Sequence, residues 1–389
     1  MRFSRRHLLL GSLAAASVGA QARAAEDRSQ ELQALIDRAA RSGAPLTLPP
    51  GTFRARDLVL RSGARINARP GATRIVFGGG DALVSGCTIA NVKGNALSLT
   101  RCGGIVGDNT ITDAADTALF SLDSRLLMRG NAIARSGNGG IRVWRSVKQS
   151  DGSVIEGNTI ADTQARGGGD GQNGNAINVF RAADVTVRGN TIRNAAFTAV
   201  RGNAASRIKI IGNTCFALGE VAIYSEFEFE DATIADNLID VAAVGIAVTN
   251  MDKGGHGAVV RNNTIRNMIN KRPQGGPDSH GVGIGVEADT EVTGNTVENA
   301  PVMGIEVGSG KYLRNVTVTK NVLRKTGIGI GVTVVEGAGS ATITDNVIAD
   351  AKDGAVVGMR WDKPATGDLT KSGAAAFAHL RIAGNQVNR

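Results

Sequence analysis

Side chains that could bind a sugar recur at one position of a repeated strand pattern between residues 142 and 306. In this pattern aliphatic residues flank a variable one, as in Ile141-Arg142-Val143 and Ile305-Glu306-Val307. Alternation with a period of two indicates strands with one buried face, so the variable residues point outward. Aromatic rings stack on sugars, and arginine can pair with a uronate carboxylate. The predicted substrate-binding residues are Arg142, Trp144, Asn178, Phe180, Tyr224, Glu226, Lys253 and Glu306.

The same region offers residues for two kinds of sugar chemistry. A lyase or an epimerase removes a proton next to a carboxylate, which needs a positioned base and a cation against the developing charge. A hydrolase needs two carboxylates that flank one bond, and Glu226, Glu287 and Glu306 are available on separate turns. Each of these residues could instead belong to an ordinary solvated face. The predicted catalytic residues are Asp278, His280, Arg201 and Glu287.

Inserted segments support a groove at these strands. Residues 164–173 and 270–280 come just before such a strand, and residues 144–152 and 250–257 just after one. Insertions cost a repeat protein little and collect on functional faces. Loops that enter and leave one sheet in this way would wall a groove along its outer face.

The sequence predicts neither a metal site nor a cofactor. Three cysteines cannot form a disulfide framework, and no Cys-x-x-Cys motif occurs. His256 and His280 lie on opposite sides of a predicted strand, and no third histidine is near. The glycines at 167–169 precede no helix that would complete a phosphate-binding loop.

An internal repeat positions all of these residues. Its unit is [Gly/Asp/Asn/Lys]-Asn-x-[Ile/Val/Leu/Cys], at spacings of 22 to 39 residues, and the shortest spacing corresponds to one turn. Three short strands per turn predict an all-β fold, a right-handed single-stranded parallel β-helix of about 12 turns of 22 or more residues. Amides at one buried corner would pair up the stack, with Cys87 in an asparagine position. The asparagines are Asn109, Asn131, Asn158, Asn190, Asn213, Asn237, Asn263, Asn295, Asn321, Asn346 and Asn385.

Residues 1–24 are predicted to be a twin-arginine signal peptide. Arg5-Arg6 precede an apolar run, residues 8–18, that is too short to span a bilayer, and Ala22-Arg23-Ala24 offers a cleavage site. An ordinary secretory signal is the alternative. Either signal predicts a periplasmic or secreted protein, and the first makes the twin-arginine translocase a partner during export.

Charge and hydropathy exclude some partners of the mature chain. The net charge of +9 includes four arginines of the leader, so the mature chain carries 9 − 4 = +5 and no basic run. We therefore expect no nucleic-acid partner. No membrane span is predicted after the leader is removed.

Both ends of the predicted solenoid carry segments that could cover an open sheet edge. Residues 26–44 are predicted to form a capping helix that ends at Gly43 and has Leu32, Leu35, Ile36 and Ala39 on one side. Residues 45–389 are predicted to form the β-helix. Within them, residues 361–378 are predicted to cover the last turn.

The sequence resembles known β-helix proteins over the whole mature chain. A capping helix, the segment Leu46-Thr47-Leu48-Pro49-Pro50-Gly51-Thr52-Phe53 and asparagine-rich turns are similar to the pectate-lyase-like right-handed β-helix superfamily. The twin-arginine start joined to this repeat resembles a family of translocated repeat proteins of unknown function. The superfamily includes polysaccharide lyases, glycoside hydrolases and alginate C-5 epimerases, but also non-catalytic spikes and adhesins, so the fold does not decide the function. Pro277-Asp278-Ser279-His280 resembles the D-P-H-D element of alginate epimerases, in another order and without the final aspartate.

Three functions remain open from the sequence. The first is an exported protein that binds a polysaccharide or oligosaccharide and modifies it as a lyase, an epimerase or a hydrolase. The second is a non-catalytic envelope protein that uses the same surface for binding or scaffolding. The third, a cofactor carrier, is motivated only by Arg5-Arg6. Whether the protein is an enzyme is therefore left open.

Overall fold

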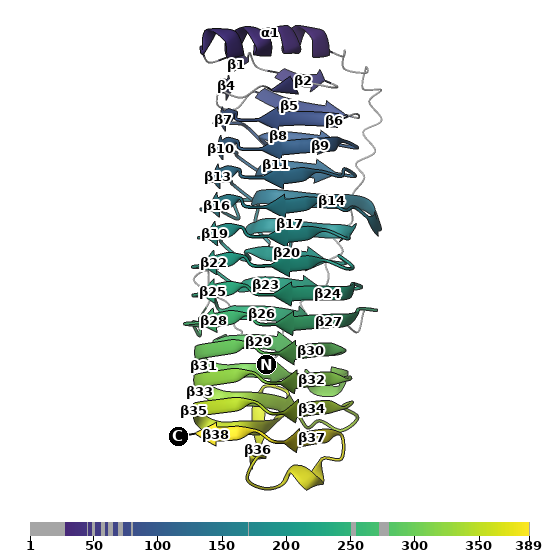
Figure 1. The fold of residues 1–389 in the computed structure, drawn as a ribbon, viewed down its shortest axis with the longest axis vertical. Helices are drawn as coiled ribbons and strands as arrows, with labels where there is room; N and C mark the ends of the chain where they lie inside the picture. Colours follow the sequence, from purple (N-terminus) through teal and green to yellow (C-terminus); the bar gives the residue numbers. More distant parts are fainter. Residues whose placement is uncertain are drawn as a thin grey trace.

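The protein is a long stack of parallel strands with a helix at one end (Figure 1). The computed structural model describes residues 28–44, 46–48, 51–55, 59–60, 65–68, 73–78, 81–169, 171–249, 254–271 and 280–388. The predicted leader, residues 1–24, lies outside them. Among the described helices, none is both long and apolar enough to cross a membrane.

Each turn of the stack contributes three strands, and each strand pairs in parallel with the equivalent strand of the next turn. One kind builds a 13-stranded sheet. Its members are β3 (Val59–Leu60), β6 (Asp81–Ser85), β9 (Gly103–Gly107), β12 (Leu127–Arg129), β15 (Val154–Glu156), β18 (Thr186–Arg188), β21 (Lys209–Ile211), β24 (Glu230–Ala235), β27 (His256–Arg261), β30 (Thr290–Thr293), β32 (Val316–Thr319), β34 (Ala341–Thr344) and β37 (Leu380–Ala383).

The other two kinds belong to one 25-stranded sheet. Short corner strands are β1 (Leu46–Leu48), β4 (Arg65–Ala68), β7 (Thr88–Ala90), β10 (Thr110–Thr112), β13 (Ala132–Ala134), β16 (Thr159–Ala161), β19 (Thr191–Arg193), β22 (Thr214–Phe216), β25 (Leu238–Asp240), β28 (Thr264–Arg266) and β38 (Gln386–Asn388). The face strands are β2 (Gly51–Ala55), β5 (Thr73–Gly78), β8 (Leu97–Thr100), β11 (Thr117–Leu122), β14 (Gly139–Ser150), β17 (Asn175–Ala183), β20 (Val200–Asn203), β23 (Val221–Glu226), β26 (Val244–Thr249) and β29 (Val282–Val286). Corner and face strands merge in β31 (Thr296–Val307), β33 (Val322–Thr333) and β35 (Val347–Arg360).

The predicted parallel β-helix is confirmed. Its core is filled by the inward half of each alternating strand, as in the column Ile141, Ile177, Val200, Ile223 and Ile246. These aliphatic side chains are all fully buried. The two-residue period therefore assigns the intervening residues of every face strand to the outside.

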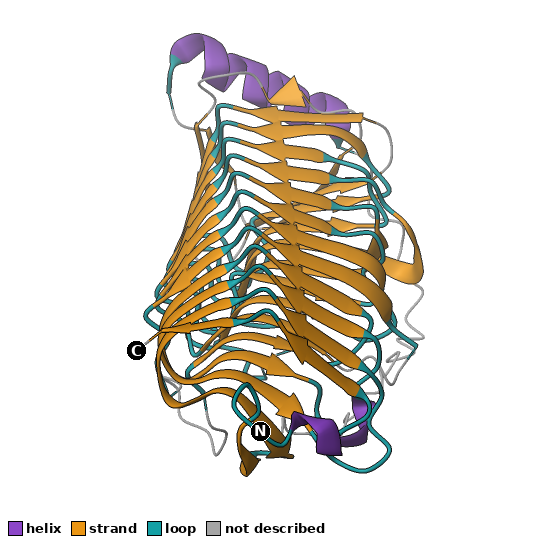
Figure 2. Cartoon of the chain, turned by 60° about the horizontal axis from the view of Figure 1, so that its bottom comes forward, coloured by secondary structure: helices purple, strands orange, loops and turns teal. Residues whose placement is uncertain are grey.

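The repeated asparagines form the predicted buried ladder. From Asn109 to Asn385, the Nδ2 of each donates to the Oδ1 of the next at 2.9–3.0 Å. Before each asparagine the backbone turns through a left-handed residue, such as Gly157 at φ 61° or Asp236 at φ 58°, which accounts for the glycine and aspartate of the repeat unit. Figure 2 shows these corners in line from turn to turn. Cys87 takes the asparagine position as predicted, and its backbone N–H donates to Asn109 Oδ1 at 3.0 Å.

A second buried corner was not predicted. Ser124 lies 22 residues after Cys102, and its Oγ accepts the Cys102 backbone N–H at 3.0 Å. Ser153 Oγ accepts the N–H of Leu126 one turn later, also at 3.0 Å. Cys102 is therefore a buried corner residue of the stack.

Helix α1 (Ser29–Ser42) lies across the first turns of the stack, as the amphipathic pattern predicts (Figure 1). Leu32, Ile36 and Ala39 are buried, and the helix ends at Gly43, whose φ of 66° is the left-handed conformation of a typical C-cap. At the other end, β36 (Lys363–Asp368) folds back antiparallel on β35. Short 3-10 turns occur at Gly310–Tyr312 and Ala374–Ala376, and Phe377 packs against the end of the core.

Candidate functional site

The outward side chains of the face strands from β11 to β31 line up in two rows, which we call the outer face. The first row is Phe120, Arg142, Asn178, Arg201, Tyr224, Ala247, Gly285 and Glu306. The second row, two residues later on each strand, is Leu122, Trp144, Phe180, Asn203, Glu226 and Thr249, followed by Glu287 directly after β29. Parallel in-register pairing thus makes neighbours of residues that are 21 to 38 positions apart in the sequence, as Gly285 and Glu306 or Ala247 and Gly285 show.

Three aromatic rings on neighbouring turns form a platform at one end of the outer face. The ring centroids of Phe120 and Trp144 are 5.4 Å apart, and those of Trp144 and Phe180 are 5.7 Å apart. Trp144 Nε1 donates to Asn178 Oδ1 at 2.8 Å, and Asn178 Nδ2 donates to the Gly171 carbonyl at 3.1 Å. All three rings are half-buried, so the platform is both held in place and accessible.

Phe120 was missed by the sequence prediction. It lies 22 residues before Arg142, in Ala118-Leu119-Phe120-Ser121, which has the same small-aliphatic-variable pattern as Gly140-Ile141-Arg142-Val143. A search for aromatic residues at the variable position one turn earlier would have found it.

The guanidinium of Arg142 holds the inserted loop of residues 164–173. Its NH2 donates to Asn173 Oδ1 at 2.8 Å and to the Gln172 carbonyl at 3.0 Å, while NH1 lies 3.5 Å from Asp116 Oδ1. Burial lowers the pKa of Arg142, and the carboxylate of Asp116 opposes that effect. Arg142 therefore anchors a wall of the outer face, and its predicted contact with substrate remains a prediction.

Arg201, Tyr224 and Glu226 form a preorganised cluster in the middle of the outer face. Arg201 Nε and NH2 both donate to Glu226 Oε1, at 2.7 and 2.6 Å. Asn203 Nδ2 donates to the same oxygen at 3.0 Å, and the Arg201 guanidinium lies 4.9 Å from the centre of the Tyr224 ring. Burial raises the pKa of the Tyr224 hydroxyl, which therefore stays protonated. The cluster holds one carboxylate in a single orientation.

Two further carboxylates lie on adjacent turns beyond this cluster. Glu306 pairs with Gly285 across β29 and β31, and Glu287 follows β29 two residues after Gly285. In the full-length chain burial raises the pKa of Glu306 to about 7, and the Glu287 carboxylate acts in the same direction. A carboxyl group with a raised pKa next to a second carboxylate is a pair that acid–base chemistry on a sugar can use.

Of the remaining predicted site residues, the structure describes His280 but not Lys253 or Asp278. His280 is buried directly before β29, whereas His256 starts β27 in the other sheet. Lys253 and Asp278 lie outside the described residues. Their proposed roles therefore remain predictions.

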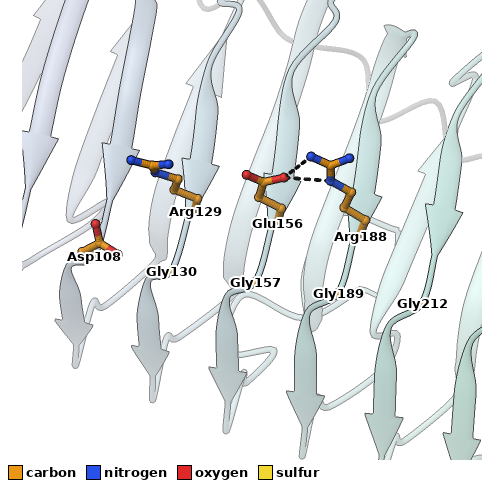
Figure 3. Close-up of a pocket in the computed structure, with 8 residues that line it drawn as sticks. All are labelled: Asp108, Arg129, Gly130, Glu156, Gly157, Arg188, Gly189 and Gly212. Carbon is orange, nitrogen blue, oxygen red and sulfur yellow. Dashed lines mark hydrogen bonds and ion pairs between the residues drawn. The ribbon is translucent and has the colours of Figure 1, made fainter.

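A second groove of about 710 Å³ runs along another edge of the stack and carries alternating charges (Figure 3). Its charged residues are Asp108, Arg129, Glu156 and Arg188, separated by glycines. Arg188 donates to Glu156 at 2.7 Å through Nε, and its side chain is 59% exposed. Exposed ion pairs of this kind contribute little and are screened by salt. We assign no function to this groove.

Sequence comparison places the chain in a family. The profile described as Periplasmic copper-binding protein (NosD) matches residues 164–374, more than half of the 389 residues. The chain belongs to the NosD family. A second profile, the right-handed β-helix region, matches residues 73–167 of this NosD-family protein. No protein of curated function gives a significant match.

Solved structures show the same fold at low sequence identity. A hyperthermoactive exopolygalacturonase from Thermotoga maritima is 11% identical, with a TM-score of 0.50, over 94% of this chain and 88% of that chain. A GH136 lacto-N-biosidase from Eubacterium ramulus is 11% identical, with a TM-score of 0.51, over 85% of this chain and 63% of that chain. The NosD-family chain thus spans less than two thirds of the biosidase. At this identity the likeness shows the fold alone.

In the described ranges, His, Cys, Asp and Glu side chains do not form the copper site that the family description suggests. Copper prefers thiolate, thioether and imidazole ligands, but no group of three or more His, Cys, Asp or Glu side chains in the described ranges could hold a metal ion. Burial raises the pKa of Cys87 and of Cys215 to about 12, so both remain protonated thiols and poor ligands. Cys215 lies in the core between Ile192 and Ile239. We therefore propose no reaction step that uses copper.

Proposed function

We propose that this NosD-family protein binds a glycan along the outer face, with Trp144 as the principal stacking ring. The carrying observation is the platform of Phe120, Trp144 and Phe180 on consecutive turns, half-buried and next to the hydrogen-bonding amide of Asn178. The three rings meet edge to face, with interplanar angles of 89° and 63°, and the Arg142 guanidinium lies 5.4 Å from the centre of the Trp144 ring. A pyranose that stacks on the exposed part of a ring fixed in this way would cost little side-chain freedom. The rows beyond the platform are largely buried, with Arg201 at 7%, Glu226 at 1% and Glu306 at 5% exposure, so the proposed contact is centred on the rings.

We also propose that the protein acts outside the cytoplasm. Arg5-Arg6, the short apolar run and Ala22-Arg23-Ala24 support export by the twin-arginine route. The word periplasmic in the description of the family agrees with this proposal.

Binding is tested by a pair of tryptophan variants, because the chain has only two tryptophans. Trp144 is on the platform, whereas Trp361 follows β35 and is 44% exposed. Loss of an aromatic anchor costs about 2 kcal/mol, or roughly 30-fold in affinity. In affinity electrophoresis against a panel of neutral and acidic glycans, Trp144→Ala should lose at least about tenfold and Trp361→Ala should match the wild type. Equal binding by both variants would refute the platform.

Hydrolysis of the bound glycan is the second candidate function. It is favoured by the position of Glu287 and Glu306 on adjacent turns. Glu306, whose pKa is about 7, would protonate the leaving oxygen, and Glu287 would act as the base or nucleophile. A bound glycan should then yield new reducing ends, and Glu306→Gln or Glu287→Gln should abolish them while binding persists. Binding without any product in the wild type would favour the non-catalytic envelope protein. Unsaturated products would instead favour a lyase.

A further inference from the structure

We infer that the glycan accepted by the outer face is uncharged rather than a uronate polymer. This inference rests on the proposed function and names its substrate class. A uronate needs a cation that can pair with its carboxylate, and Arg201 already forms an ion pair with Glu226. Its Nε and NH2 lie 2.7 and 2.6 Å from Glu226 Oε1, and the two side chains are 9% and 1% exposed. A uronate could gain Arg201 only by displacing a buried carboxylate, which would then lack its partner.

The guanidinium of Arg142 also has partners within the protein. Its hydrogen bonds hold Asn173 and the carbonyl of Gln172, and Asp116 supplies a negative charge at 3.5 Å. Only 8% of its side chain is exposed. Release of this arginine would remove two of the hydrogen bonds that hold the loop of residues 164–173 against the outer face.

The charges that remain on the outer face are negative. The two rows contain Arg142 and Arg201 against Glu226 and Glu287, and Glu306 adds a third negative charge when it is ionised, so their sum is 2 − 2 = 0 with Glu306 protonated and 2 − 3 = −1 with Glu306 ionised. A uronate would be placed beside Glu287 and Glu306, and like charges in a poorly solvated site repel one another strongly. Among the described residues, Arg181 is an exposed cation beside the platform, 4.8 Å from the Phe180 ring centre, and Lys148 is a second exposed cation on the strand of Trp144. Salt screens such an exposed charge.

A neutral pyranose meets complementary groups instead. Ala247 and Gly285 leave two small positions in the first row between Tyr224 and Glu306. The carboxylates beside these positions are poorly solvated, since Glu226 is 1% and Glu287 8% exposed, and a neutral sugar places no second charge next to them. Hydroxyl groups satisfy carboxylate oxygens without adding charge.

The inference is tested with matched glycan pairs that differ in charge alone. Uronans such as polygalacturonate and mannuronan are compared with their carboxyl-reduced forms, alongside neutral glucans and galactans. Affinity for the full chain, with and without residues 1–24, is measured by affinity electrophoresis at low and high salt. We expect the tightest ligands to be neutral, at least tenfold tighter than any uronan, with affinities that change little with salt. A uronan as the tightest ligand, with an affinity that falls as salt rises, would overturn the inference and leave the proposed glycan binding intact.

Charge variants give a second readout. Glu226→Gln keeps a hydrogen-bonding oxygen near Arg201 but removes its counter-charge, so the relative affinity for uronans should rise at least tenfold. Glu306→Gln should move the preference in the same direction without touching the Arg201 pair. Arg181→Ala serves as the control and should leave the preference unchanged. An unchanged preference in both glutamine variants would overturn the inference, whereas binding of no glycan by the wild type would refute the proposed function itself.

Discussion

Replacement of Asn190 by leucine tests the asparagine ladder that holds the stack together. The amide of Asn190 makes five hydrogen bonds. Its Oδ1 accepts from Asn158 N and Nδ2, both at 2.9 Å. Its Nδ2 donates to Ile155 O, Arg188 O and Asn213 Oδ1, at 3.0, 3.1 and 2.9 Å. The residue is 1% exposed, so water cannot replace these partners.

The cost follows from the groups that Asn190→Leu leaves unpaired. The Asn158 backbone N–H loses the partner described for it, and four further polar groups lose one partner each. A fully unpaired buried group costs about 1–3 kcal/mol. Because these four groups keep part of their bonding, we expect a loss of about 3–5 kcal/mol in the free energy of unfolding. Urea denaturation followed by circular dichroism measures this loss, and amide hydrogen exchange shows whether it is confined to the neighbouring turns.

Asn385→Leu is the matched control, because Asn385 occupies the last, half-buried position of the same ladder. Its side chain makes three of these bonds rather than five, and its own position is open to water on one side, so we expect a smaller loss of about 1–2 kcal/mol. Arg201→Ala is a poor control, although an outward position suggests a mild effect, because it leaves the buried Glu226 without its cation. Equal losses for Asn190→Leu and Asn385→Leu would refute the reasoning that burial gives the ladder its strength.

Two further predictions concern the cysteines and copper. Burial raises the pKa of Cys87 and of Cys215 to about 12. Neither thiol should therefore react with a disulfide reagent at pH 8 until urea unfolds the protein, and rapid reaction of the folded protein would contradict their burial. The unfolded thiols ionise near pH 9, so the contribution of the two buried thiols to the free energy of unfolding should be complete below pH 9 and should fall between pH 9 and 12. Cys215→Ala should flatten that part of the pH–stability curve. In competition with a Cu(I) chelator we expect no stoichiometric copper uptake, and a tight 1:1 complex that survives Cys215→Ser would point to ligands outside the described residues.

Local and periodic features of the sequence determined the fold. The asparagine spacing, with its minimum of 22 residues, and the alternation of aliphatic residues both recur on every turn. A wrong assignment of one repeat unit is therefore detected by comparison with the neighbouring units. The same periodicity places Arg142, Trp144, Tyr224 and Glu306 on one outward face before any coordinates are known. The capping helix was equally readable, because Leu32, Ile36 and Gly43 carry its pattern within one short segment.

The tertiary structure alone decided which charges are available on that face. Arg201 and Glu226 are 25 residues apart, and Arg142 and Asn173 are 31 apart, across turns whose lengths differ through their insertions. Whether two such side chains meet depends on rotamers and on how each loop closes over the sheet, and neither follows a period. From the sequence, an outward arginine such as Arg201 is therefore predicted to bind a uronate. In the folded chain, Arg201 is paired with a buried carboxylate instead. The repeat dictates the direction of a side chain, and packing between turns dictates its partner.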